Sequence, residues 1–176
     1  MARVSSGCCL LSFRLLFQGK FKVFLDNITS CRDPEPPLAR KPALLYDYKI
    51  YNQNGHNYIS GTSAVLREVS FINLGLKTYN VDSSSGRRQL QFAAEKLTCR
   101  SLGGQAVLVL TNINYTRSKC LLTKGNSTFK EIDVNKIAHR VPAWHAAGSL
   151  LNRLHLVDRG HTVFCYEVST TVRDLD

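Results

Sequence analysis

The chain has 176 residues, 44% of them hydrophobic, which is enough to bury one core, and we expect one domain. A formal net charge of +10, from 23 lysines and arginines against 13 acidic residues, favours anionic partners such as nucleic acid, glycosaminoglycan or acidic lipid. No stretch reaches the roughly 18 to 20 apolar residues that a membrane-spanning helix needs, so a membrane-embedded chain is not expected.

The first 22 residues are typical of a targeting segment. Arg3 lies near the start, an apolar run covers residues 8–17, and no acidic residue precedes Asp26. Arg14 interrupts the apolar run that a secretory signal requires, whereas a mitochondrial presequence accepts arginine and serine without acidic residues. An ordinary first helix or strand is the structural alternative. The N-terminal segment by itself therefore leaves the compartment open.

Two further features favour the secretory pathway. Three asparagines stand in acceptor sequons for N-glycosylation, a modification of that pathway. They are Asn27, Asn114 and Asn126. If the targeting segment is removed, an even set of four cysteines remains, which allows three pairings. These disulfide candidates are Cys31, Cys99, Cys120 and Cys165. Four buried reduced thiols are the alternative.

The chain continues with a proline-rich segment and a hairpin. Four of the five prolines lie between residues 31 and 42, so we expect 23–43 to be an extended linker before a single domain at 44–176. Residues 45–51 have aromatic and β-branched character, and Asn54-Gly55 supplies the positive φ of a tight turn. Residues 64–72 alternate like a further strand.

The middle of the chain predicts a second hairpin and a short helix. Strands are expected at 76–81 and 87–92, joined by a serine-rich turn that ends at Gly86. Residues 93–102 place their apolar side chains near one helical face, and Gly103-Gly104 would end this helix as a C-cap.

The remaining pattern predicts a parallel crossover. The apolar run 106–110 does not alternate, as in a strand covered on both faces, and the polar residues 111–128 indicate a loop. A short strand is expected at 129–134, a helix from Pro142 to Val157, and a buried strand at 161–168. Strand, helix and strand in succession imply an α/β fold: one compact domain with a mixed β-sheet, an N-terminal antiparallel hairpin region and packed helices.

The sequence predicts no catalytic residue, no metal site and no cofactor. No two histidines show the i, i+4 spacing that places two metal ligands on one helix face. The cysteines have no basic neighbour arranged by sequence to activate a nucleophile. The chain is therefore less expected to be an enzyme than a binding protein.

The densest basic positions are candidates for binding a polyanion, with a solvated basic surface as the alternative. They are Arg87, Arg88, Lys96, Arg100, Arg117, Lys119 and Lys124. Stacking on nucleic-acid bases would need aromatic side chains as well. The tyrosines of segment 46–58 could form such a platform, but packing against a neighbouring strand explains them better, because only Lys49 accompanies them.

The stretch "GLKTYNVDSSSGRRQLQF", followed after a gap by "GGQAVLVLTN", resembles the core of an ILEI/PANDER-type domain. This domain forms secreted cytokine-like inducers and also occurs within large hyaluronan-processing cell-surface proteins. The likeness rests on Gly75-Leu76, the turn at 82–86, Phe92 and the run 104–110. Where that family usually has an acidic loop, residues 112–124 are basic. The resemblance implies a secreted signalling domain.

Together these features predict a secreted, glycosylated, disulfide-bonded and non-enzymatic binding or signalling domain, which engages a protein receptor or an acidic glycan. The alternative is a mitochondrial RNA-associated protein. The basic balance and Arg14 favour that alternative, and the sequons do not.

Overall fold

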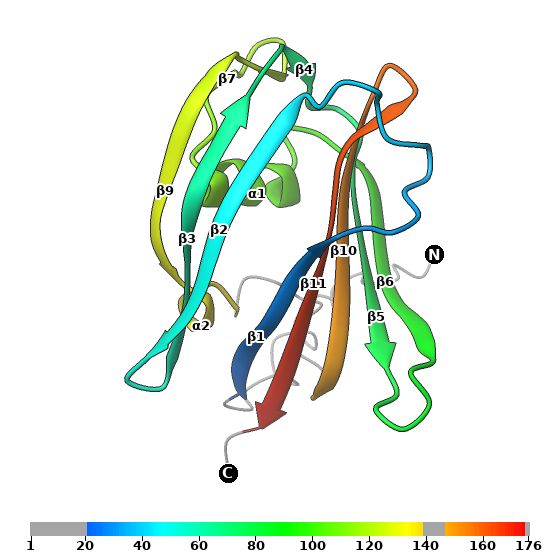
Figure 1. Ribbon diagram of the computed structural model, residues 1–176, viewed down its shortest axis with the longest axis vertical. Helices are drawn as coiled ribbons and strands as arrows, with labels where there is room; N and C mark the ends of the chain where they lie inside the picture. The colour runs from blue at the N-terminus through cyan, green and yellow to red at the C-terminus, as the bar shows by residue number, and fades with distance from the viewer. Residues whose placement is uncertain (1–20, 139–146, 175–176) are drawn as a thin grey trace, which may run out of the picture.

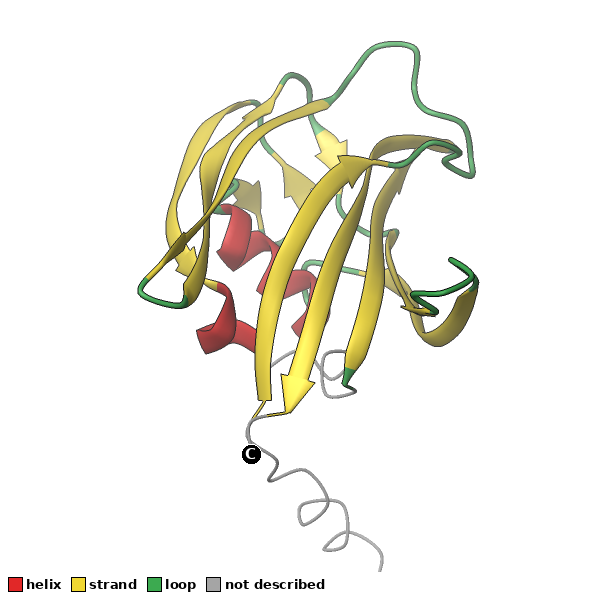
Figure 2. Ribbon diagram, turned by 60° about the horizontal axis from the view of Figure 1, so that its bottom comes forward, coloured by secondary structure: helices red, strands yellow, loops and turns green. Residues whose placement is uncertain are grey.

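The computed structural model describes residues 21–138 and 147–174. Within these two stretches the chain forms two main antiparallel β-sheets that face each other, a small third sheet and two short helices (Figure 1). Figure 2 shows both helices in the space between the two main sheets.

The larger sheet has the strand order β1-β11-β10-β5-β6. These strands are β1 (Phe21–Ser30), β11 (His161–Asp174), β10 (Gly148–Asp158), β5 (Leu74–Val81) and β6 (Arg88–Leu97). All neighbouring strands pair antiparallel. The most extensive pairing joins β10 and β11 through a tight hairpin at Arg159 and Gly160, both of which have positive φ.

The smaller main sheet has the order β2-β3-β9 and is also antiparallel. Its strands are β2 (Leu44–Gln53), β3 (His56–Val65) and β9 (Gly125–Asp133). The predicted hairpin between β2 and β3 is confirmed, with φ values of 53° at Asn54 and 75° at Gly55.

Short elements close the ends of the two sheets. Three two-residue strands form the small third sheet in the order β4-β8-β7. They are β4 (Val69–Ser70), β8 (Leu121–Leu122) and β7 (Tyr115–Thr116). The helices are α1 (Leu102–Thr111) and α2 (Val134–Ala138). Helix α2 contacts β1 of the larger sheet and β3 of the smaller one.

The predicted α/β fold with a mixed sheet and packed helices is wrong. Every ladder between named strands is antiparallel in the part of the chain that the structure describes, and there is no parallel crossover between those strands. Most of the described residues are in strands, and the two helices are short. The architecture is that of a β-sandwich, in which each sheet buries one face against the other.

The predicted inner strand at 106–110 is wrong, because these residues lie in helix α1. The Ser101 side chain caps the helix by accepting a hydrogen bond from the Gly104 amide at 3.2 Å, and Asn112 ends the helix in the left-handed region. At Gly104 a Cβ would lie 2.0 Å from the Thr98 carbonyl oxygen, so only glycine fits. The glycine pair thus lies at the start of α1 and does not end a helix before it.

Two predicted helices are also wrong where the structure describes them. The first half of segment 93–102 belongs to β6, where Ala93 and Ala94 pair with Lys77 and Leu76 of β5. This ladder outweighs the helix preference of alanine. From Gly148 onward the predicted C-terminal helix is strand β10, held between β5 and β11. Pro142 and Trp144 lie outside the described residues.

Other strand predictions are confirmed or corrected in part. The hairpin at 76–81 and 87–92 and the strand at 161–168 are confirmed, and 129–133 belong to β9. The strand expected at 64–72 is interrupted, because β3 ends at Val65 and the Leu66 amide instead donates to the carbonyl of Ala43. The loop expected at 111–128 contains β7, β8 and the start of β9. Within the expected linker, residues 23–30 belong to β1.

The predicted disulfide bonds are present, and the structure selects the pairing. Cys31 is bonded to Cys165, which ties the segment after β1 to β11, and Cys99 is bonded to Cys120, which ties the segment before α1 to the one before β8. Their sequence separations are 134 and 21 residues.

We expect removal of the long-range disulfide to be the more damaging change. The chain-entropy model gives roughly 3 kcal/mol for a loop of about 15 residues and roughly 4.7 kcal/mol for one of about 100. The double variant C31A/C165A should therefore lose about 1–2 kcal/mol more unfolding free energy than C99A/C120A. Guanidinium titration of both variants measures the difference, and equal losses or a larger loss for C99A/C120A would contradict this ranking.

Candidate ligand-binding cavity

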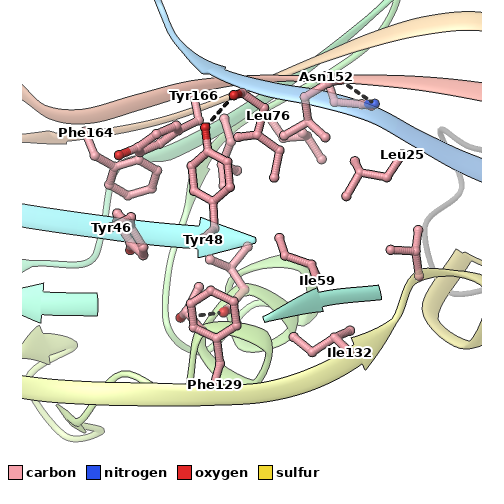
Figure 3. Close-up of a pocket in the computed structure, with 16 residues that line it drawn as sticks. Leu25, Tyr46, Tyr48, Ile59, Leu76, Phe129, Ile132, Asn152, Phe164 and Tyr166 are labelled. Carbon is pink, nitrogen blue, oxygen red and sulfur yellow. Dashed lines mark hydrogen bonds between the residues drawn. The ribbon is translucent and has the colours of Figure 1, made fainter. Parts of the chain in front are cut away.

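A cavity of about 270 Å³ lies between the two main sheets (Figure 3). A water molecule takes up roughly 30 Å³ in the liquid, so the space is about nine times that of one water. Side chains of a well-packed domain core leave few voids larger than a single water. The cavity is thus too large to be an ordinary packing defect.

The wall on the larger sheet comes from the inward faces of its central strands. On β11, Phe164, Tyr166 and Val168 line the cavity, while the residues between them point outward. Leu154 on β10 and Leu76 on β5 continue this wall and pair directly in the ladder.

The facing wall comes from the smaller main sheet. Tyr46 and Tyr48 on β2 alternate with the exposed Asp47, and Phe129 contributes from β9. Gly61 of β3 permits this arrangement, because a Cβ there would lie 2.7 Å from the Phe129 ring and 2.2 Å from the Asp47 carbonyl oxygen. A larger residue at position 61 would force both neighbours away.

Helices and the first strand complete the lining. Val107 and Thr111 reach the cavity from α1, and Val134 reaches it from α2. Leu25 and Ile28 contribute from β1. Except for Thr111, these residues belong to, or pack against, the two hydrophobic clusters of the core, so the cavity is continuous with the core.

Four aromatic rings form a cluster on one side of the cavity. Tyr166 makes edge contacts with Tyr46 at 5.6 Å and with Tyr48 at 6.3 Å between ring centroids, and Phe164 lies 5.8 Å from Tyr46. Burial, with a smaller contribution from the nearby phenol of Tyr166, raises the pKa of Tyr46 well above its usual range. Burial and the neighbouring Tyr48 raise the pKa of Tyr166 as well. Both phenols therefore remain uncharged at neutral pH.

Tyr48 also connects the two sheets. Its hydroxyl donates a hydrogen bond to the carbonyl of Ile28 on β1, as Figure 3 shows. The first strands of the two sheets, β1 and β2, share no ladder, so this bond crosses between their edges.

A buried polar row crosses the inner face of the larger sheet at Asn152, which also lines the cavity. The Thr78 hydroxyl donates to the Asn152 side-chain oxygen at 2.9 Å. The Asn152 amide group donates to the Thr170 hydroxyl at 3.3 Å and to the Val168 carbonyl at 3.4 Å. Asn152 is thereby satisfied by its own sheet.

Sequence reasoning identified none of the cavity. For the tyrosines of segment 46–58 the sequence favours strand packing over a base-stacking platform, and Tyr46 and Tyr48 do pack against β11. The strict alternation over residues 46–49 indicates that Tyr46 and Tyr48 point inward. It does not indicate whether the space that they face is a filled core or a cavity. Tyr51 and Tyr58 stack at 5.5 Å near the other end of the hairpin, outside the cavity.

The seven predicted polyanion residues lie on or beside β6, before α1, and between β7 and β9. The guanidinium of Arg100 donates to the Ser118 carbonyl at 3.0 Å, which brings Arg100 beside the segment that carries Arg117 and Lys119. Arg88 instead forms an ion pair with Glu167 at 3.2 Å on the outer face of the larger sheet. The polyanion site stays a prediction, now centred on the first group.

All three sequon asparagines are exposed: Asn27 on β1, Asn114 before β7 and Asn126 on β9. Among the described residues no group of three histidine, cysteine, aspartate or glutamate side chains could hold a metal ion. No helix in the described part of the chain is long and apolar enough to cross a membrane.

Comparisons with known proteins give distant structural likenesses only. No protein-family model and no curated protein matches the chain. A crystal structure of chicken MD-1 complexed with lipid IVa is 11% identical, with a TM-score of 0.39, over 88% of this chain and 98% of that one. A solution structure of R. palustris CsgH is 10% identical, with a TM-score of 0.22, over 74% and 91%. At these TM-scores neither likeness bears on what this chain does.

Proposed function

We propose that this protein is an extracellular binding protein that takes up one apolar chain, such as the acyl chain of a lipid, between its two main sheets. The cavity of about 270 Å³ carries this proposal. Its walls are apolar and aromatic, which is typical of sites for small apolar ligands. A methylene group is close in size to water, so the space accommodates about nine or more of them, and each contributes roughly 0.8 kcal/mol when buried.

An empty apolar cavity of this size would be costly. Closed, dry cavities in protein cores destabilise by roughly 24 cal/mol per Å³, so several kcal/mol is the upper limit for this space of about 270 Å³, which is partly open to solvent. Domains are stable by only about 5–15 kcal/mol in total. A bound chain would remove this penalty, which supports a binding role over a structural accident.

Two features of the chain support an extracellular location. Disulfide bonds persist in oxidising compartments and are rare in the cytosol, and this chain has two. The three exposed sequons are compatible with the same pathway. For the mitochondrial RNA-associated alternative, Tyr46 and Tyr48 are not available as a base-stacking platform, because they line the cavity.

We expect a cavity-filling substitution to weaken uptake without unfolding the protein. The variant Val168→Phe should displace at least about two methylenes of a bound chain, which at roughly 0.8 kcal/mol each weakens binding about tenfold. Titration with diphenylhexatriene, an uncharged rod-shaped fluorophore, measures the affinity. Leu45→Phe, at a position 48% exposed and outside the cavity, is the matched control and should bind like the unmodified chain. Absence of uptake by the unmodified chain, or equal uptake by Val168→Phe, would refute the proposal.

We expect the chain to be secreted and glycosylated when made in a eukaryotic secretory host. Endoglycosidase treatment should increase its electrophoretic mobility, and the triple variant N27Q/N114Q/N126Q should show no such shift, because the three acceptors are then absent. A chain that stays inside the cell and shows no shift would contradict the extracellular assignment while leaving the cavity proposal standing.

A protein receptor or an acidic glycan is a second proposal, for the outer surface. Its support is the grouping of Arg100 with the Arg117–Lys119 segment beside the disulfide of Cys99 and Cys120. The ILEI/PANDER resemblance implies the same kind of partner and remains a prediction. One of the features that carry it, the run 104–110, lies in helix α1.

We expect the grouped arginines to matter more for glycan binding than net charge does. The variant R100A/R117A should elute from heparin at lower salt than R40A/R159A, which removes the same charge from exposed positions elsewhere. Salt-gradient chromatography on heparin measures this. Identical elution of the two variants would show that only the overall charge acts.

A further inference from the structure

Some polar side chains of the cavity lining already have hydrogen-bond partners in the protein, and others have none among the described residues. The Tyr48 hydroxyl donates to the Ile28 carbonyl, and the Thr111 hydroxyl donates to the Val107 carbonyl at 2.8 Å. Asn152 is held by Thr78 and Thr170. None of these three lining residues needs a ligand to complete its hydrogen bonds.

Two hydroxyls remain, those of Tyr46 and Tyr166. The structure gives neither a hydrogen-bond partner among the residues it describes, although both side chains line the cavity and pack against its core cluster. Their rings meet edge to face, with an angle of 83° between the ring planes. Because burial keeps both phenols uncharged, each can donate or accept one further hydrogen bond.

None of the described residues that line the cavity has a charged side chain. All of them are leucine, isoleucine, valine, phenylalanine, tyrosine, threonine or asparagine. A carboxylate or ammonium group drawn inside would meet no opposite charge, and an isolated charge in an apolar environment is strongly unfavourable. The buried part of the ligand is therefore uncharged.

The open hydroxyls lie at one side of the cavity. In Figure 3, Tyr46, Phe164 and Tyr166 gather on one side, and Leu25 and Ile132 lie on the other. A chain with one polar group would place that group against the tyrosines and its hydrocarbon toward β1 and α2.

We infer that the ligand is a single-chain lipid with an uncharged polar end, such as a long-chain alcohol or ester, whose polar group is hydrogen-bonded by Tyr46 and Tyr166. This inference rests on the proposed function and adds the chemical class and the orientation of the ligand. A hydrogen bond of this kind contributes roughly 0.5–1.5 kcal/mol net, or about two- to tenfold in affinity.

The test is competition against diphenylhexatriene by three ligands of equal chain length: dodecane, dodecanol and dodecanoate at neutral pH. Dodecanol should bind several-fold more tightly than dodecane, and dodecanoate at least about tenfold more weakly than dodecanol. In Y46F/Y166F the advantage of dodecanol over dodecane should disappear while dodecane binds as before. Tyr79→Phe, which changes a tyrosine outside the lining, is the control and should keep the advantage.

The outcomes separate the two proposals. If the unmodified chain takes up no fluorophore and none of the three ligands, the binding function itself fails, and this inference fails with it. If the fluorophore binds but dodecanol has no advantage, or the advantage survives in Y46F/Y166F, only the assigned polar contact fails. If dodecanoate binds most tightly, the uncharged class is wrong while uptake of an apolar chain stands.

Discussion

The fold depends on two antiparallel sheets whose inward faces meet without filling the space between them. Facing sheets normally interdigitate over a core about 10 Å thick. Here α1 and α2 lie between the sheets, with α2 in contact with both β1 and β3 (Figure 2). The disulfide between Cys31 and Cys165 fixes β11 to the segment that follows β1. The gap that remains is a cavity with apolar walls.

On the larger sheet, charged side chains lie on the outer face and uncharged ones on the inner face. Outward residues of the larger sheet form ion pairs, for example Arg153 with Glu167 at 2.6 Å and Lys77 with Glu95 at 3.2 Å. Inward residues of the same strands line the cavity and carry no charge. Because successive side chains of a strand alternate between faces, one sheet provides both a charged outer surface and an apolar wall of the cavity.

The tyrosines of the cavity lining contribute both apolar contact area and hydrogen-bonding groups. The ring of a tyrosine adds apolar contact area, and its hydroxyl can bond where no charge is tolerated. Tyr48 uses that hydroxyl to join the sheets, whereas Tyr46 and Tyr166 keep theirs available. The same residue type thus links the two sheets and, in the proposed binding mode, would hydrogen-bond the ligand.

The sequence by itself determined the local features: the turns at Asn54-Gly55 and Gly86, the strands beside them, and four cysteines available to pair. The sequence pattern misassigned 106–110, because a short apolar run fits a buried strand or a buried helix equally well. It also misassigned 93–97, because pairing with β5 overrides the helix preference of alanine. Tertiary structure alone decided the disulfide pairing, the β-sandwich and the cavity. Each of these depends on which inward faces meet and how far apart they stay, and alternation along one strand contains no information about that distance.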